Sequence, residues 1–353
     1  MTTVIETLAT KRIVVCCGPG GVGKTTVSSA LALRLAETGK RVCVLTIDPA
    51  RRLSDALGIE TLDDSPRVVP GVRQGSLKAA MLSTAGTFDA LIDRYAENPE
   101  QAAQIKANRL YQNLATSLSG MQEYMAIEKL NELTNDDSID IVVLDTPPTR
   151  NALDVITAPS RLTRFLENRI FRALLSPTTS YLRVISIATR SVLTSLGSIA
   201  GAELVDDAVA FFQAFHGMEQ GFAERATSMR EILGSDLTAY VLVTSPRLDA
   251  IEEAHYFADQ LSKATLTTNA MIVNRVLSGF LGPDIPDSLI ARNDELGHLA
   301  QVAQDLRRAA EDGRDAIEDL ARAIGPTPVI SLAYQQGDIH SIEGLRDLGA
   351  QLI

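Results

Sequence analysis

Eight residues near the start of the chain have the types and spacing of a phosphate-binding loop. Gly18 is followed by four residues and then by Gly23, Lys24 and Thr25, which is the P-loop pattern. Glycines let backbone N–H groups turn toward phosphate oxygens, and the N-terminus of the following helix adds partial positive charge. The pattern predicts that Lys24 contacts the β- and γ-phosphates of a nucleotide and that the Thr25 hydroxyl binds Mg²⁺.

The segments on either side of this loop favour the same interpretation. A continuous apolar run precedes it (Arg12–Gly18), and Thr25–Thr38 has the spacing of an amphipathic helix that ends before Gly39. The alternative is a glycine-rich turn that matches by chance, but a strand before the loop and a helix after it are the context of a P-loop. The predicted nucleotide-binding residues are Gly20, Gly21, Val22, Gly23, Lys24, Thr25 and Thr26.

Two aspartates follow other strand-like runs. Asp48 ends the run Arg41–Asp48, and Asp145 ends the run Ile139–Asp145. In open parallel sheets, ligands bind at the carboxyl ends of the strands, where a Walker-B aspartate holds the Mg²⁺ shell. A single strand-end aspartate is more often a turn former or helix cap. Because this chain has two strand-end aspartates and a P-loop, we predict that both aspartates lie in the nucleotide site.

The remaining pattern predicts an α/β fold with a doubly wound, mostly parallel sheet. Strand, helix and strand in short order form right-handed βαβ units, and helices such as Ala250–Leu261 fit between the strands. The further strands are predicted at Leu237–Thr244, Ala270–Asn274 and Pro328–Leu332.

Two long intervals lack a strand signal and predict an inserted α-helical subdomain. They cover about residues 83–133 and 160–233. The first includes an amphipathic stretch around Leu110–Met125, and the second has an apolar helical face between Leu182 and Ala200. No repeat or low-complexity linker separates them from the rest, so we expect one P-loop ATPase domain over residues 1–353 with helical elaborations.

The composition excludes several classes of protein. The chain has 353 residues, of which 45% are hydrophobic and 22% charged, with a formal net charge of −11. These values are typical of a folded globular protein, and the negative charge argues against a nucleic-acid partner. No uncharged apolar run approaches the roughly 20 residues of a membrane-spanning helix, and the first residues do not form a secretory signal. We therefore expect a cytoplasmic protein.

Four motifs together resemble one family, the ArsA-like ATPases. They are "GGVGKTT", "DPARRLSDAL", "DTPPT" and "IVNR", and the likeness runs from about Lys11 to the C-terminus. That family includes the arsenite-pump ATPase and the ATPase that targets tail-anchored membrane proteins, and it is related to MinD and the nitrogenase iron protein. The resemblance implies a dimeric ATPase with ATP and Mg²⁺ as cofactors, whose nucleotide state moves a helical subdomain that carries an apolar cargo or partner.

The resemblance also implies roles for single residues. Lys24, Asp48 and Asp145 would be the catalytic set, with Asp48 orienting the attacking water. Thr25 and Asp145 would be the residues linked to Mg²⁺, and Asn274 would contact the adenine. The C-terminal stretch "LAYQQGDIHSIEGL" is similar to the closing loop of the family but lacks its usual proline, so no adenine contact is assigned to it.

Pro19 departs from the family pattern. A lysine normally stands there, and its ammonium crosses a dimer interface to the phosphates of the partner, whereas proline has neither charge nor N–H. Three hypotheses follow: a related subunit supplies the missing cation, hydrolysis is slow and nucleotide acts as a clamp, or Arg51 or Arg52 substitutes. The alternative for these arginines is a solvated loop face. We favour the first hypothesis, a heterodimer of related ATPases over a homodimer.

Cysteine usage bears on the cargo. Arsenite requires soft thiolate ligands, but Cys16, Cys17 and Cys43 all lie in apolar strand-like runs, where buried, reduced side chains are expected. An arsenite-type pump is therefore disfavoured. Apolar faces at Ile170–Ala200 and Ala208–Met218 predict a groove for an apolar helix of a membrane-protein client, although such faces also pack against each other as ordinary core.

Three alternatives belong to other functional classes. A non-catalytic, nucleotide-clamped subunit is favoured by Pro19 but disfavoured by the intact Lys24, Thr25, Asp48 and Asp145. Positioning of the ParA or MinD type needs DNA affinity or a membrane-binding helix, for which the acidic balance and the short C-terminus give no basis. An iron–sulfur reductase needs cysteine ligands that the chain lacks. The prediction is thus a cytoplasmic ATPase, with any membrane association made through a partner.

Overall fold

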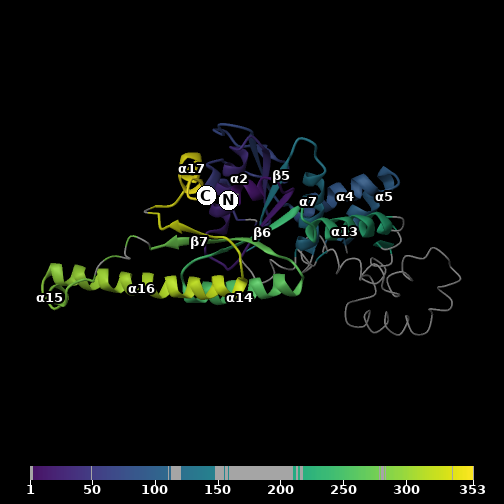
Figure 1. Cartoon of the computed structure of the whole chain (residues 1–353). Coiled ribbons are helices and arrows are strands. Elements are labelled where there is room, and N and C mark those ends of the chain that lie inside the picture. The colour runs from purple at the N-terminus through teal and green to yellow at the C-terminus, as the bar shows by residue number, and fades with distance from the viewer. Residues whose placement is uncertain are drawn as a thin grey trace, which may run out of the picture. The chain divides into compact units, whose positions relative to one another are not determined.

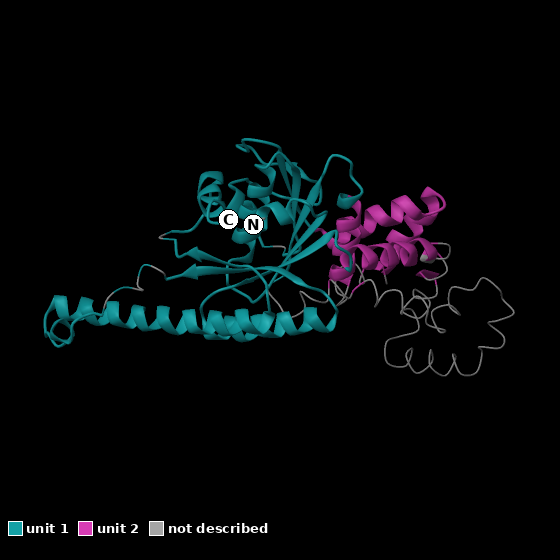
Figure 2. Ribbon diagram, viewed as in Figure 1, with its two compact units in different colours: residues 1–81, 133–153, 234–353 teal, residues 82–132, 154–233 magenta. Residues whose placement is uncertain are grey.

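The computed structural model describes most of the chain, which separates into two compact units. It describes residues 3–48, 50–109, 111–112, 121–147, 155, 158, 210–211, 214, 218–277, 279, 282, 284–335 and 337–352. The first unit comprises residues 1–81, 133–153 and 234–353, and the second comprises residues 82–132 and 154–233 (Figure 2). The predicted apolar face between Leu182 and Ala200 and most of the stretch Ala208–Met218 lie outside the described residues.

An eight-stranded sheet forms the centre of the first unit. Its strand order is β3-β4-β2-β5-β1-β6-β7-β8, and every neighbouring pair is parallel except the antiparallel pair β3–β4. This confirms the predicted α/β fold with a mostly parallel sheet. The strands are β1 (Ile13–Cys17), β2 (Arg41–Thr46), β3 (Arg67–Val68), β4 (Ser76–Met81), β5 (Ile141–Asp145), β6 (Thr238–Thr244), β7 (Thr268–Val276) and β8 (Val329–Ala333).

Helices cover both faces of this sheet (Figure 1). The central strands β1, β5 and β6 are buried along their whole length, which explains why they read as continuous apolar runs in the sequence. The helices of this unit are α1 (Val4–Leu8), α2 (Lys24–Ala36), α3 (Arg52–Leu57), α14 (Leu248–Lys263), α15 (Asp287–Ile290), α16 (Glu295–Ile324) and α17 (Ile342–Gly349).

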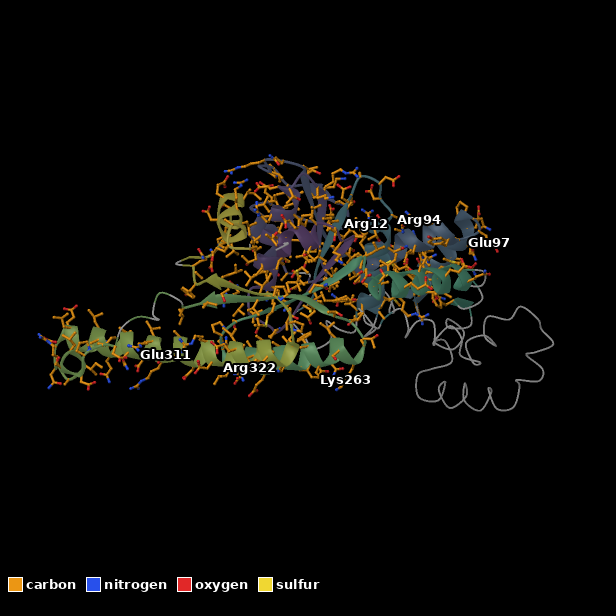
Figure 3. The ribbon with its side chains drawn as sticks, in the orientation of Figure 1. Arg12, Arg94, Glu97, Lys263, Glu311 and Arg322 are labelled. Carbon is orange, nitrogen blue, oxygen red and sulfur yellow. The ribbon has the colours of Figure 1, made fainter. Side chains whose placement is uncertain are left out.

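The start of β1 is fixed by an arginine. Arg12 (Figure 3) donates hydrogen bonds from its guanidinium to the backbone carbonyls of Thr134 and Ile139, just before β5. The two strands are then paired in register, with Ile13 opposite Val142 and Cys16 opposite Asp145. Their carboxyl ends therefore lie level at one edge of the sheet.

The second unit is helical among its described residues. Its helices are α4 (Thr84–Tyr95), α5 (Pro99–Ala107), α13 (Glu219–Leu233) and most of α7 (Met121–Thr134). Arg225 on α13 forms an ion pair with Glu128 on α7 at 2.9 Å, and these side chains are only 14% and 3% exposed. The same guanidinium lies 3.8 Å from the ring centroid of Tyr95 on α4. A paired, stacked arginine thus links three helices of this unit.

Several elements have no counterpart among the predictions. Strand β4 carries Lys78 and two alanines, and β3 has only two residues, so neither reads as an apolar run. The 30-residue helix α16 was also not predicted. Among the residues that the structure describes, no helix is long and apolar enough to cross a membrane.

Candidate functional site

The loop between β1 and α2 requires glycine at specific points. Gly18 has φ +145°, and a Cβ there would lie 2.0 Å from the carbonyl oxygen of Val243 on β6. Gly23 has φ +86°, and a Cβ there would lie 2.5 Å from Nδ2 of Asn274 on β7. A side chain at either position would displace backbone or a buried amide, so the loop is packed tightly against the ends of two neighbouring strands.

Lys24 is the first residue of α2 and is buried. Its ammonium donates hydrogen bonds to the carbonyl oxygens of Gly18, at 2.9 Å, and Pro19, at 2.7 Å. Burial lowers the pKa of Lys24, and the negative charge of Asp145 opposes this shift. The amine is therefore held over the loop by backbone oxygens, within the electrostatic reach of a carboxylate.

Asp145 is fully buried at the end of β5. One of its oxygens, Oδ2, accepts hydrogen bonds from the hydroxyls of Thr25, at 2.8 Å, and Thr46, at 3.0 Å. The other oxygen, Oδ1, is buried without a hydrogen-bond partner among the described residues. Burial raises the pKa of Asp145, while the two threonine hydroxyls and Lys24 favour its charged form. Helix α2 and strands β2 and β5 thus converge on this carboxylate.

Asp48 follows β2 and lies in the segment that leads to α3. Its Oδ1 accepts a hydrogen bond from the backbone N–H of Ala50 at 3.0 Å, and its Oδ2 pairs with the guanidinium of Arg52 at 3.0 Å. The side chain of Asp48 is 14% exposed, whereas that of Arg52 is 61% exposed. The carboxylate is thus well anchored, while the arginine that pairs with it remains open to solvent.

Asn274 and Arg275, near the end of β7, contact carbonyl groups of the glycine-rich loop. Nδ2 of Asn274 donates to the carbonyl oxygen of Val22 at 2.9 Å, and Nη1 of Arg275 donates to that of Gly21 at 3.2 Å. Arg275 has φ +63°, an uncommon conformation for a residue with a side chain. These bonds hold two loop carbonyls on the side of β7.

A cavity of about 460 Å³ opens above the loop, within the size range of small-molecule sites. It brings together Gly21, Gly23, Lys24, Thr25, Thr26 and Asp48 from the predicted set. Asp145 is connected to it through the hydroxyl of Thr25. The other lining residues are Arg52, Asp55, Ala56, Thr146, Arg275, Asp338, Ile339 and His340.

Three of these lining residues come from the C-terminal stretch, to which the sequence analysis assigned no contact. Asp338, Ile339 and His340 precede α17. A Cβ on Gly58, at the end of α3, would lie 3.1 Å from the carbonyl oxygen of His340. This close backbone approach brings the stretch to the cavity. Its likeness to a closing loop was the signal that pointed here.

Pro19 lies at a second cavity, of about 440 Å³, on the other side of the loop. The predicted residues Gly20 and Val22 also line it, and Gly21 lines both cavities. Its far wall is acidic and is formed by the start of α14 and the segment before it. The remaining lining residues are Ser245, Arg247, Asp249, Ala250, Glu252 and Glu253. Pro19 therefore does not line the cavity that contains Lys24.

The three cysteines are buried and form no disulfide, as expected. Burial raises the pKa of Cys17 to about 12, so the thiol stays protonated at neutral pH. In the helical unit, Phe211 from the predicted apolar groove is buried, with its ring centroid 6.4 Å from that of Tyr111. This one aromatic ring therefore packs within its own unit.

A known protein family matches most of this chain. Residues 11–283 match a family described as anion-transporting ATPase. The matched span includes the glycine-rich loop, both strand-end aspartates and Asn274.

Individual relatives extend the likeness over most of the chain. A protein named ATPase get3 from Aspergillus terreus is 27% identical over 296 residues, which are 84% of this chain and 82% of the relative. A protein of the same name from Aspergillus niger is 28% identical over 269 residues, which are 76% of this chain and 74% of the relative.

Proposed function

This chain belongs to the anion-transporting ATPase family and is an ATPase, and on that premise we propose that it binds Mg-ATP in the cavity above the loop that joins β1 to α2. The bond between Thr25 and Asp145 carries the proposal. It joins the residue after the P-loop lysine to a strand-end carboxylate, as a phosphate-binding loop and a Walker-B aspartate require.

The residues of the cavity have complementary tasks in hydrolysis. Backbone amides of the loop and the ammonium of Lys24 bind the phosphates, which requires Lys24 to exchange the carbonyls of Gly18 and Pro19 for phosphate oxygens. Asp48 accepts a hydrogen bond from the attacking water and orients it toward the terminal phosphate. Asn274 supports the loop from β7 and lies at the strand end where the adenine is expected.

The residues around Asp145 also fit a Mg²⁺ ion. The ion prefers oxygen ligands and is usually held by one or two carboxylates together with substrate phosphates. The Thr25 hydroxyl and the buried, unpartnered Oδ1 of Asp145 offer such oxygens. When bound, Mg²⁺ would neutralise charge on the β- and γ-phosphates.

The same proposal extends to the helical unit, its client and the partner subunit. We treat the helical unit as an elaboration of one ATPase domain that moves with the nucleotide state and carries an apolar helix of a membrane-protein client. In this proposal the chain acts in the cytoplasm as a dimer. Because Pro19 carries no charge, we favour a related subunit as its partner, and that subunit would bring a cation to the phosphates. The absence of cysteine from the predicted insertions supports a client other than arsenite.

Calorimetry with Mg-ATP tests the binding step. The full chain is expected to bind Mg-ATP, and Lys24→Ala to weaken binding by at least tenfold because a phosphate-contacting ammonium is lost. Lys11→Ala is a matched control, since Lys11 lies outside both cavities and donates to the carbonyl of Asp236. Absence of binding by the unaltered chain, alone and with a related subunit, would refute the proposed function.

A further inference from the structure

Arg52 carries its positive charge at a position where its own helix does not favour one. It is the first residue of α3, where a positive side chain is unfavourable because the helix N-terminus already carries partial positive charge. It forms an ion pair with Asp48, and it lines the cavity that holds Lys24 and Thr25. The neighbouring Arg51, which has the same charge, does not line this cavity. The sequence did not distinguish Arg51 from Arg52, but in the structure Arg52 lines the cavity and Arg51 does not.

The pair between Arg52 and Asp48 occupies one oxygen of the carboxylate that the proposed function assigns to water. Oδ1 of Asp48 accepts a backbone N–H and Oδ2 accepts the guanidinium, so two of the about four acceptor sites of the carboxylate are taken. Release of the arginine would leave Oδ2 open to a water molecule. Because the arginine is 61% exposed and faces the cavity, it is free to rotate toward a bound anion.

The described lining of the cavity offers few cations to a triphosphate. Pro19 contributes no charge and lies at the other cavity, so Lys24, Arg52 and Arg275 are the basic lysine and arginine side chains among the described lining residues. Arg275 is bonded to the carbonyl of Gly21. The positive charge of Arg52 already acts on Lys24: burial is the main cause of the lowered pKa of Lys24, and Arg52 adds to it. Lys24 and Arg52 thus both line the same cavity.

From this arrangement, and resting on the proposed function, we propose that Arg52 exchanges Asp48 for the terminal phosphate when ATP binds. The exchange places a second cation on the γ-phosphate from within the same chain, in addition to any cation that a partner subunit brings, and leaves Oδ2 of Asp48 open to the attacking water. Planar guanidinium groups suit this task because they bind phosphate oxygens bidentately. An arginine that reaches the transferring phosphate accelerates hydrolysis strongly in other nucleotide-hydrolysing enzymes.

A binding experiment in the Asp48→Asn background tests whether Arg52 contacts the terminal phosphate or serves only as the ion-pair partner of Asp48. In that background the ion pair is absent and hydrolysis is expected to be too slow to interfere, so affinity can be measured with ATP itself. The added change Arg52→Gln is expected to weaken Mg-ATP binding by about tenfold or more, while Mg-ADP binding changes less than twofold. Arg52→Lys keeps a point charge and is expected to lose less ATP affinity than Arg52→Gln.

Arg51→Gln in the same background is the matched control, with the same charge change one residue away, and its affinities are expected to stay within twofold. If Arg52→Gln leaves ATP affinity unchanged, or weakens ATP and ADP equally, the exchange is refuted. Failure of the Asp48→Asn chain itself to bind ATP would instead refute the proposed function. Circular dichroism of each variant establishes that the comparison is made between folded proteins.

Discussion

Asp48 and Asp145 are both strand-end aspartates, but their environments differ. Asp145 is fully buried between two threonine hydroxyls, whereas Asp48 lies at the cavity with one oxygen bonded to a backbone N–H and the other to an arginine. A buried carboxylate near a hydroxyl is suited to hold an ion, and one at the cavity wall is suited to orient water. At the scale of single residues, this contrast is the basis on which we propose different tasks for two similar side chains.

Replacing Asp48 by Asn tests the water-orienting task. Hydrolysis is expected to fall by about 10²–10⁴-fold, the usual contribution of a positioned base, while Mg-ATP still binds because the loop amides and Lys24 remain. Steady-state phosphate release and calorimetry measure the two effects. The role would be contradicted by a variant that hydrolyses ATP at the original rate.

Asn274 allows a second test at this scale, with a control on the same strand. In Asn274→Ala the carbonyl of Val22 loses its amide donor, so the loop is expected to be held less firmly and Mg-ATP affinity to fall severalfold. Leaving a buried polar group without a partner costs about 1–3 kcal/mol. In Asn269→Ala the backbone N–H of Tyr240 loses its acceptor, far from the cavity.

Both asparagine variants are expected to lose stability in denaturant unfolding, but only Asn274→Ala is expected to lose nucleotide affinity. Calorimetry with Mg-ATP distinguishes them. Equal affinity of the two variants would show that the β7 end does not support nucleotide binding through this amide.

At the scale of elements, α16 shows two different environments along one helix. Its last turns contribute Ile317 and Leu320 to the protein interior, whereas Leu296, Leu299 and Val302 in its first turns are exposed. The helix packs with α14 and β7 in the first unit. Its length alone therefore does not indicate how much of it stabilises the fold.

Two leucines of α16 test this division. Leu320→Ala is expected to lower the free energy of unfolding by about 2–5 kcal/mol, because Leu320 is 0% exposed and its removal leaves a cavity. Leu299→Ala removes the same atoms from a side chain that is 58% exposed and is expected to change stability by less than about 0.5 kcal/mol. Urea unfolding measures both, and similar losses would contradict the proposed packing.

At the scale of the whole molecule, the proposed function includes a partner subunit that adds positive charge to that of Lys24 and Arg52. Pro19 faces a cavity whose wall includes Asp249, Glu252 and Glu253, so a cation at that position would meet carboxylates. The family resemblance places a lysine here that acts across a dimer interface. We therefore expect the hydrolysis rate of the unaltered chain to depend on its assembly state.

Pro19→Lys tests this link. The lone unaltered chain is expected to bind Mg-ATP but to hydrolyse it slowly, and Pro19→Lys to raise the rate at least tenfold if the substituted chain pairs with itself, since a cation on the transferring phosphate has large effects. Native mass spectrometry reports the assembly state alongside the rate. A tight homodimer of the unaltered chain with full activity would remove the need for a second kind of subunit.

The sequence by itself determined the parallel sheet and the loop at its edge. Runs such as Ile141–Leu144 are apolar throughout because they are buried on both faces, so they are visible without a structure. The spacing from Gly18 to Thr25 is similarly local, since the loop needs its glycines and lysine within eight residues. These are patterns of neighbours in the chain, and the sequence records them directly.

Only the tertiary structure decided which distant residues share the cavity. Strand β4, with Lys78 in its middle, carries no local pattern that marks its place, and the likeness of the C-terminal stretch to a closing loop did not show that Asp338 and His340 line the cavity. The same holds for the separation of Arg52 from Arg51, which depends on the direction that the chain takes into α3. Contacts between residues far apart in sequence follow from how the elements pack, and no local spacing encodes them.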